Sequence, residues 1–244
     1  MNKVLTLGLV SLAGGTGRST LVAEFGRSLA ERGFNVALIE LDPSNSLGGL
    51  MDHGHARSQG MASGLIPVTT TQGHLVYLPH DVLAIREAAG MRPDRVVSDL
   101  RSDPALLHHP LDFILLDVAR GPDPSMEQAL ALADRIIHVL TPVHRGLEDA
   151  RRLAAWPQIE GNASRLVHLI NRLDGRRLLD RDLVRIFKES LGDRLMNEMV
   201  HEDQAVPESQ ARGLTLSAYA PKSQAHRDIQ GLVNWIVACR RSLT

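Results

Sequence analysis

The sequence predicts an α/β fold: a mostly parallel β-sheet with helices on both faces, formed by one domain that spans residues 1–244. Two observations favour this fold. Short apolar segments alternate with longer amphipathic ones, which is the pattern of buried strands joined by right-handed helical crossovers. The chain of 244 residues also has no obvious linker, and one α/β domain of this size is common.

Six apolar runs have the length of strands that are buried on both faces, and five amphipathic segments have the length of helices. In the first predicted helix, Leu21, Phe25 and Leu29 share one face, and Gly33 is a stop signal. We expect the segment 43–73, which is rich in Gly, Ser, Thr and His, to be the least regular. The predicted strands cover 4–10, 36–41, 75–78, 113–118, 136–140 and 166–170, and the predicted helices 19–32, 125–134, 147–156, 178–191 and 225–239.

The composition is that of an ordinary soluble domain, with 43% hydrophobic and 23% charged residues. A net charge of -1 and 3% aromatic residues argue against a dedicated nucleic-acid binder, although a local basic patch remains open. The single cysteine, Cys239, excludes an intramolecular disulfide framework and fits a reducing cytoplasm. The apolar N-terminal run leads directly into a glycine-rich turn, so we interpret it as a buried strand and not an export signal. We therefore expect a cytoplasmic protein.

The turn after the first strand has the composition of a phosphate-binding loop. Residues 11–20 read Ser-Leu-Ala-Gly-Gly-Thr-Gly-Arg-Ser-Thr, and the first predicted helix begins at their end. Glycines let backbone amides approach phosphate oxygens, and the helix N-terminus adds the positive end of its dipole. The residues expected to bind the phosphates are Gly14, Gly15, Thr16, Gly17, Arg18, Ser19 and Thr20.

This loop departs from the pattern G-x-x-x-x-G-K-[ST] at two positions. Leu12 replaces the first glycine, and Arg18 replaces the lysine. Arginine keeps the positive charge, but it is longer and planar, so the replacement is not conservative. Nucleotide binding can survive this change even where catalysis is lost. The alternative to a phosphate-binding loop is a glycine-rich turn between strand and helix that binds no ligand.

Two predicted strands end in carboxylates. Asp42 lies in the sequence Glu-Leu-Asp-Pro that closes the second strand, and Asp117 follows four apolar residues in the form of a Walker B strand, whose Asp holds Mg²⁺. Ligands of open α/β sheets bind at the carboxyl ends of the strands, so both acids are expected near the glycine loop. We expect Ser19 and Asp117 to hold Mg²⁺, directly or through water.

The order of these pieces resembles the MinD/ParA family of deviant Walker A P-loop proteins, and the resemblance spans nearly the whole chain. It implies ATP and Mg²⁺ as ligands, a face-to-face homodimer, and Asp42 as the catalytic residue facing the γ-phosphate. The family has a lysine at the start of the loop, where this chain has Ala13, so slow or absent hydrolysis is expected. Arg120 is either a substitute for that lysine or an exposed arginine without a ligand role.

The second half of the chain extends the resemblance. Residues 169–172 are similar to the strand end that contacts adenine in this family, and residues 200–213 to the segment that closes over the base. The His-x-Asp variant of that segment, with a loop lacking both lysines, resembles most the cellulose biosynthesis branch called BcsQ or YhjQ. This implies an accessory subunit that acts through protein partners in a cellulose synthase secretion complex. The residues that the resemblance assigns to the base are Asn171, Arg172, His201 and Asp203.

Two other functions remain open: a ParA-like partition ATPase that binds DNA, and a nucleotide-free scaffold. Five arginines could form a DNA-facing patch, or interleaved acids could pair with them on a solvated helix, which we favour. The apolar stripe of the last predicted helix is expected to pack on the sheet, with peripheral membrane contact as the alternative. The arginines are Arg172, Arg176, Arg177, Arg181 and Arg185, the acids Asp174, Asp180 and Asp182, and the stripe Ile229, Leu232, Val233, Ile236 and Cys239.

Overall fold

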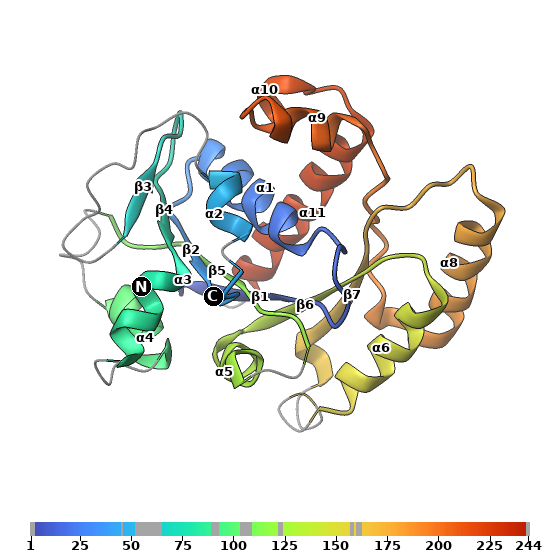
Figure 1. Cartoon of the computed structure of the whole chain (residues 1–244), viewed down its shortest axis with the longest axis horizontal. Coiled ribbons are helices and arrows are strands. Elements are labelled where there is room, and N and C mark those ends of the chain that lie inside the picture. Colours follow the sequence, from blue (N-terminus) through green and yellow to red (C-terminus); the bar gives the residue numbers. More distant parts are fainter. Residues whose placement is uncertain are drawn as a thin grey trace.

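The computed structural model describes residues 3–44, 46–51, 65–88, 93–102, 109–121, 124–156, 159 and 163–242. Within these residues one sheet of seven strands runs through the molecule (Figure 1). The strands are β1 (Leu5–Val10), β2 (Val36–Glu40), β3 (Ile66–Val68), β4 (Leu75–Leu78), β5 (Phe113–Asp117), β6 (Arg135–Leu140) and β7 (Leu166–Ile170). Their order is β3-β4-β2-β5-β1-β6-β7, and every neighbouring pair is parallel except β3 and β4.

Helices cover both faces of the sheet, which confirms the predicted fold class (Figure 1). On one face, α1, α2 and α11 pack against β1, β2 and β5. On the other face, α3, α4 and α5 pack against the same strands. The helices are α1 (Arg18–Glu31), α2 (Ser46–Met51), α3 (His80–Ala88), α4 (Pro93–Ser102), α5 (Pro124–Leu132), α6 (His144–Ala154), α8 (Leu178–Leu191), α9 (Ala205–Ala211), α10 (Leu216–Tyr219) and α11 (Gln224–Arg241).

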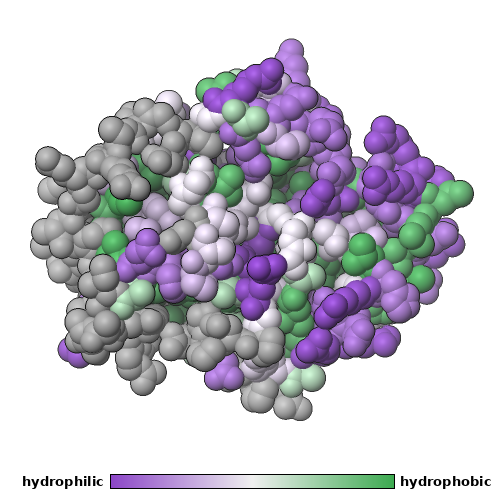
Figure 2. All heavy atoms as spheres, in the orientation of Figure 1, coloured by the Kyte–Doolittle hydropathy of each residue, from purple (hydrophilic) through white to green (hydrophobic). Residues whose placement is uncertain are grey.

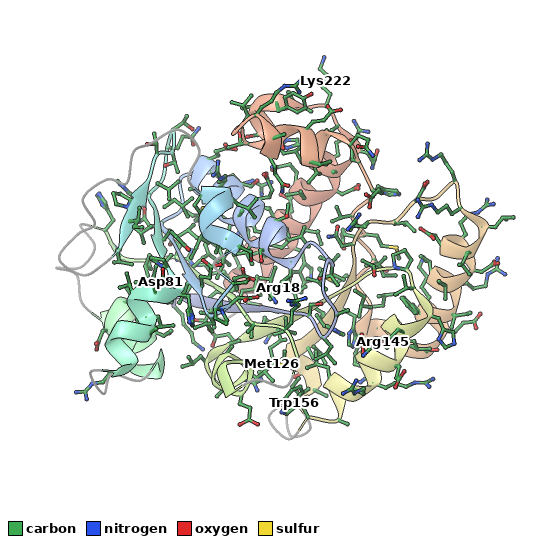
Figure 3. The ribbon with its side chains drawn as sticks, viewed as in Figure 1. Arg18, Asp81, Met126, Arg145, Trp156 and Lys222 are labelled. Atoms are coloured by element: carbon green, nitrogen blue, oxygen red, sulfur yellow. The ribbon has the colours of Figure 1, made fainter. Side chains whose placement is uncertain are left out.

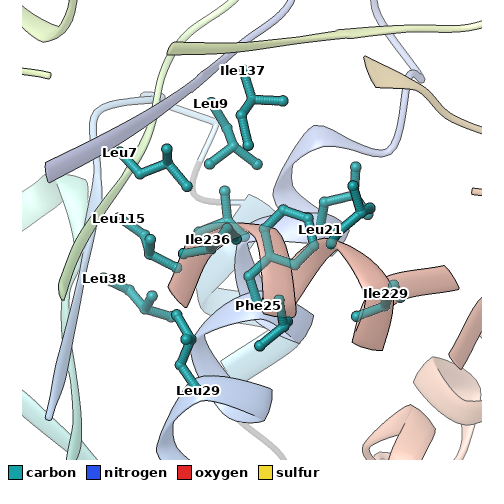
Figure 4. Close-up of a cluster of buried hydrophobic side chains, with 14 of the residues drawn as sticks. Leu7, Leu9, Leu21, Phe25, Leu29, Leu38, Leu115, Ile137, Ile229 and Ile236 are labelled. Atoms are coloured by element: carbon teal, nitrogen blue, oxygen red, sulfur yellow. The ribbon is translucent and has the colours of Figure 1, made fainter. Parts of the chain in front are cut away.

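The core on the first face is built by α1 and α11. Leu21, Phe25 and Leu29 of α1 are buried at helical spacing, and α1 ends before Gly33, whose φ of 86° suits a glycine. Ile229 and Ile236 of α11 pack beside them against strand side chains (Figure 4). Each such side chain stabilises the fold by about 1.5–3 kcal/mol through burial. The apolar stripe of the last helix therefore packs in the core, as predicted.

The segment 43–73, predicted to be the least regular, contains two short elements where the structure describes it. It contains α2 and β3, while residue 45 and residues 52–64 of this segment lie outside the described residues. The short α2 forms because Leu47 and Met51 are buried against α1. The sequence analysis did not predict these two short elements, because tertiary packing orders stretches too short to show a period.

The two edges of the sheet differ. At one edge, β3 is three residues long, contains Pro67 and pairs antiparallel with β4. At the other edge, isolated bridges join His168 to Leu195 and Leu173 to His201, so a later segment of the chain runs beside β7. Among the described residues, no helix is both long and apolar enough to cross a membrane.

Candidate functional site

The glycine-rich loop connects β1 to α1 and lies at the carboxyl ends of the central strands β1, β2 and β5. Gly15 and Gly17 have φ of 73° and 81°, a left-handed backbone that favours glycine. Inside the loop, the Thr16 hydroxyl donates to Ser11 Oγ at 3.1 Å, and Ser11 Oγ donates to the Ala13 carbonyl at 2.8 Å. These bonds fix the loop as an open cradle that ends at the N-terminus of α1.

Two residues from the end of β7 brace this loop from outside. Asn171 Nδ2 donates to the Thr16 carbonyl at 2.7 Å, and Arg172 Nη1 donates to the Gly15 carbonyl at 2.9 Å. Arg172 also pairs with Glu202 at 2.8 Å and adopts a left-handed φ of 61°, a strained backbone for an arginine. The residues predicted to contact the base thus also hold the phosphate loop in shape.

Two adjoining cavities open at the loop. We call the cavity at the glycine loop the phosphate cavity and the one beside Asn171 the base cavity, after the groups that the sequence predicts there. Their volumes are about 250 and 210 Å³, and Gly17 and Thr20 line both. Together they bring nearly all the predicted binding residues into one place. The phosphate cavity is lined by Ala13, Gly15, Thr16, Gly17, Arg18, Ser19, Thr20, Asp42, Ser44, Ser46 and Arg120; the base cavity includes Asn171, Arg172, His201, Glu202, Asp203 and Gln210.

Helix-capping bonds hold the predicted base segment. His201 Nδ1 lies 2.8 Å from Asp228 Oδ2, on α11. The Asp203 carboxylate accepts from the Ala205 amide at 2.9 Å and from the Ala225 amide at 3.2 Å, and so binds first-turn amides of both α9 and α11. The sequence predicted His201 and Asp203 beside the base, but it did not predict their hydrogen bonds to α9 and α11.

Arg18 makes the contacts that sequence reasoning did not anticipate. Its Nε donates to Asp117 Oδ1 at 2.5 Å, and its Nη2 donates to Asp42 Oδ2 at 2.6 Å (Figure 3 labels Arg18). The Arg18 side chain is only 6% exposed, and Asp117 is fully buried. The guanidinium is therefore directed at the two strand-end acids, although Arg18 was expected to hold phosphate.

The two acids differ in how their surroundings affect them. Burial raises the pKa of the Asp117 carboxyl above its ordinary value, and the Arg18 charge opposes this shift. Burial also raises the pKa of Asp42, but the Ser44 amide and the Arg18 guanidinium outweigh it, so that pKa lies below its ordinary value. Both oxygens of Asp42 are engaged, since Oδ1 accepts from the Ser44 amide at 2.9 Å.

The residues predicted to hold Mg²⁺ do not fit that ion well in this arrangement. Ser19 Oγ lies 2.9 Å from Ser46 Oγ, and Asp117 Oδ1 is bound by Arg18. Among the described residues, Asp117 Oδ2 is buried without a hydrogen-bond partner, which alone would suit a metal-bound water. The metal role of Ser19 and Asp117 and the catalytic role of Asp42 stay predictions.

The structure brings Arg120 to the loop. A Cβ added at Gly14 would lie 2.5 Å from Arg120 Nη1, so the guanidinium rests against Gly14 and faces the phosphate cavity together with Ala13. Sequence reasoning missed Ser46 and Gln210, whose side chain donates to Thr20 Oγ1 at 3.2 Å. Hydroxyl residues directly after the Asp-Pro strand end were a signal for Ser46; nothing in the sequence pointed to Gln210.

The fold, with its glycine loop between β1 and α1, is that of the MinD/ParA P-loop proteins. The solved ParA family ATPase of Chlorobium tepidum gives a TM-score of 0.72 with this chain, at 22% identity, over 96% of this chain and 99% of that one. The MinD cell division protein of Aquifex aeolicus gives a TM-score of 0.71 at 19% identity, over 96% and 97%. MinD of Pyrococcus horikoshii, complexed with Mg-ADP, gives 0.66 at 19% identity, over 96% of both chains.

Sequence comparison narrows the class. The chain belongs to the family of the cellulose biosynthesis protein BcsQ, whose profile matches residues 3–237. A curated relative, the chromosome-partitioning ATPase Soj of Thermus thermophilus, is 25% identical over 247 aligned positions, which cover 97% of this chain and 96% of Soj. The chain is thus a MinD/ParA-like protein of the BcsQ family.

Proposed function

We propose that this protein binds ATP in the two adjoining cavities, forms a sandwich dimer around it, and hydrolyses it slowly or not at all. The observation that carries the proposal is the continuous site in which the phosphate cavity and the base cavity meet at Gly17 and Thr20. The glycine loop and the first residues of α1 line the first cavity, and backbone amides in such a place bind anions. A solved plasmid partition protein of the same fold, from Borrelia burgdorferi, is bound to AMPPNP.

Slow turnover is expected because charged groups are missing or engaged. Ala13 stands where a cross-dimer lysine is expected, and in related phosphoryl transfer a missing charged finger costs about 10³–10⁵ in rate. Asp42 has both oxygens engaged, which limits its capacity to position a water. A persistent ATP state would suit a switch that orders a dimer and presents a surface to a partner.

We further propose that this switch is a regulatory subunit of bacterial cellulose synthesis and secretion, at the cytoplasmic side. The match of residues 3–237 to the BcsQ family supports this role. The partners would be proteins of the secretion complex, and any membrane contact would be peripheral.

The experiment measures ATP affinity, phosphate release and particle mass on one preparation, with and without ATP. We expect micromolar or tighter binding, barely detectable phosphate release, and a doubling of the mass with ATP. Absence of ATP binding would leave a nucleotide-free scaffold. Rapid phosphate release would contradict the switch.

The likeness to Soj favours a second candidate, a partition ATPase that binds DNA. The basic segment around α8 speaks against it, because Arg176 and Arg177 pair with Asp174 at 2.9 and 3.4 Å. Binding to nonspecific duplex DNA with ATP, measured over a range of salt concentrations, separates the candidates, because phosphate contacts release counterions. A steep salt dependence would support the partition ATPase.

A further inference from the structure

The buried contact between Arg18 and the two strand-end acids joins three elements. Arg18 is the first residue of α1, Asp42 follows β2, and Asp117 is the last residue of β5. Two different nitrogens of the guanidinium serve the two carboxylates, Nε at 2.5 Å from Asp117 and Nη2 at 2.6 Å from Asp42. The contact therefore uses the fork shape of the side chain and not only its charge.

Two carboxylates placed together at the end of a buried sheet need a countercharge, because burial of an unpaired charge is strongly unfavourable. A divalent cation can supply it from solution. Here Arg18 supplies it from the chain, and an arginine stays charged at any physiological pH. The charge of the two acids is thus balanced whether or not a metal ion is present, although Asp117 Oδ2 has no hydrogen-bond partner among the described residues.

The same contact leaves little room for Mg²⁺. Magnesium demands oxygen ligands at about 2.0–2.1 Å in near-octahedral geometry. Asp117 Oδ1 is bound by Arg18, and both Asp42 oxygens are bound by Arg18 and the Ser44 amide. Of the two carboxylates only Asp117 Oδ2 has no hydrogen bond among the described residues, and a single oxygen is far from an octahedral set of ligands. A metal ion on these carboxylates would also stand beside a buried guanidinium and meet like-charge repulsion.

A second arginine lines the phosphate cavity and is available to a bound nucleotide. Arg120 rests against Gly14 and lines this cavity from the loop after β5. With the loop amides and the α1 N-terminus, it can balance phosphate charge that a metal ion would otherwise balance.

Building on the proposed ATP binding, we propose that Arg18 is the resident cation of this site and that the protein binds ATP without a divalent metal ion. An arginine at position 18 then removes the need for Mg²⁺, because its two nitrogens bind both Asp42 and Asp117. A lysine, which the general pattern has at this position, could not bind both acids in this way.

The test is isothermal titration calorimetry of the whole chain with ATP, once with excess Mg²⁺ and once with EDTA. We expect the two dissociation constants to agree within about threefold. Binding that weakens more than about tenfold in EDTA would overturn this inference and leave the proposed ATP binding intact. No binding in either buffer would remove both, so the two failures are distinguishable.

A variant tests the role of Arg18 itself. In Arg18→Lys, a single ammonium replaces the fork and cannot serve both acids from two nitrogens. We expect its ATP affinity to fall at least about tenfold when Mg²⁺ is replaced by EDTA. The control is Arg32→Lys, at the exposed end of the same helix, which should behave as the parent chain does. If Arg18→Lys folds and stays metal-independent, Arg18 is not the resident cation.

Discussion

The side-chain amide of Asn171 donates a hydrogen bond to the Thr16 carbonyl over 2.7 Å, across 155 residues of sequence. Asn171 is buried at the end of β7, and Thr16 is buried within the phosphate loop. The loop that begins the site is therefore held in shape by a residue from the second half of the chain, and the two cavities meet where this bond is made.

Replacing Asn171 by alanine should weaken both the fold and the site. The substitution leaves the Thr16 carbonyl without its buried donor, and we expect a loss of about 1–2 kcal/mol in the free energy of unfolding. ATP affinity should fall as well, because the loop loses a brace. Urea unfolding and calorimetry measure the two effects. Asn234→Ala, an exposed amide on α11, is the control and should change neither by much.

Gly17→Ala should damage the loop by strain and by collision. Its φ is 81°, and an added Cβ would lie 2.5 Å from Asn171 Nδ2. We expect a loss of about 1–3 kcal/mol in unfolding free energy together with loss of ATP binding. Gly49→Ala is the matched control, since a Cβ there meets nothing within 4 Å. Unchanged ATP binding by Gly17→Ala would show that the loop is not the phosphate site.

Tyr77→Phe should destabilise the fold near α2. The Tyr77 hydroxyl donates to the buried Glu40 carboxylate, whose other oxygen accepts from the Leu47 amide at 2.7 Å. Burial raises the pKa of Glu40, and the substitution removes one of the donors that bind this buried carboxyl group. We expect a loss of about 1–3 kcal/mol, measured by urea unfolding. Tyr219→Phe, which removes a surface bond to Glu208, should cost far less.

Stability should decrease in mild acid because of two buried histidines. His138 and His168 face each other on β6 and β7, with their Nδ1 atoms 3.1 Å apart. Burial lowers the pKa of His168 from 6.5 to about 4 and lowers that of His138 well below 6.5. Between these values the unfolded chain binds protons that the folded chain does not, so stability is fully present above pH 6.5 and is lost as the pH falls.

This pH dependence has a direct measurement. His168 alone should contribute a loss of roughly 3 kcal/mol by pH 4, followed through urea midpoints at several pH values. In His168→Phe the decrease between pH 6.5 and 4 should be shallower, while in His144→Gln, at an exposed histidine of α6, it should match the parent chain. An equally steep decrease in His168→Phe would contradict this explanation.

Much of the fold follows from the sequence because its strands are buried on both faces. The runs at β1, β5 and β7 are almost wholly apolar, interrupted within by only Thr6, Gly8 and His168, so their position is visible without any partner. The three residues of β3 include Pro67, and only pairing with β4 makes them a strand. Local pattern cannot reveal an element that exists through its neighbour.

The candidate site shows the same limit. The glycine loop and the two acids were identified from residue type and place along the chain, and the structure brings both acids to Arg18 at the end of the loop. The direction of the Arg18 side chain was not predictable, because a guanidinium at the start of α1 can reach either phosphate or the strand ends. The opposition of His138 and His168 also depends on strand register, which residue spacing does not give.

The exposed surface of α8 carries apolar residues that no sequence argument used. Leu178 and Leu179 are 70% and 67% exposed at its start, beside the charged residues of that helix. Figure 2 shows hydrophobic spheres among hydrophilic ones on this side of the molecule. Of the predicted local ion pairs, Arg176 and Arg177 pair with Asp174 just before α8. Asp180 is instead buried and accepts from the Asp174 amide.

The two borders of the sheet also restrict how copies of this protein can associate. Pro67 has no amide hydrogen to offer along β3, and the stretch that bridges to β7 at Leu195 and His201 shields the opposite border. Strand addition from a neighbouring molecule, the usual start of aggregation in open sheets, is hindered on both sides. If copies of this protein associate, the sheet edges therefore favour contacts through helices and loops over an extended intermolecular sheet.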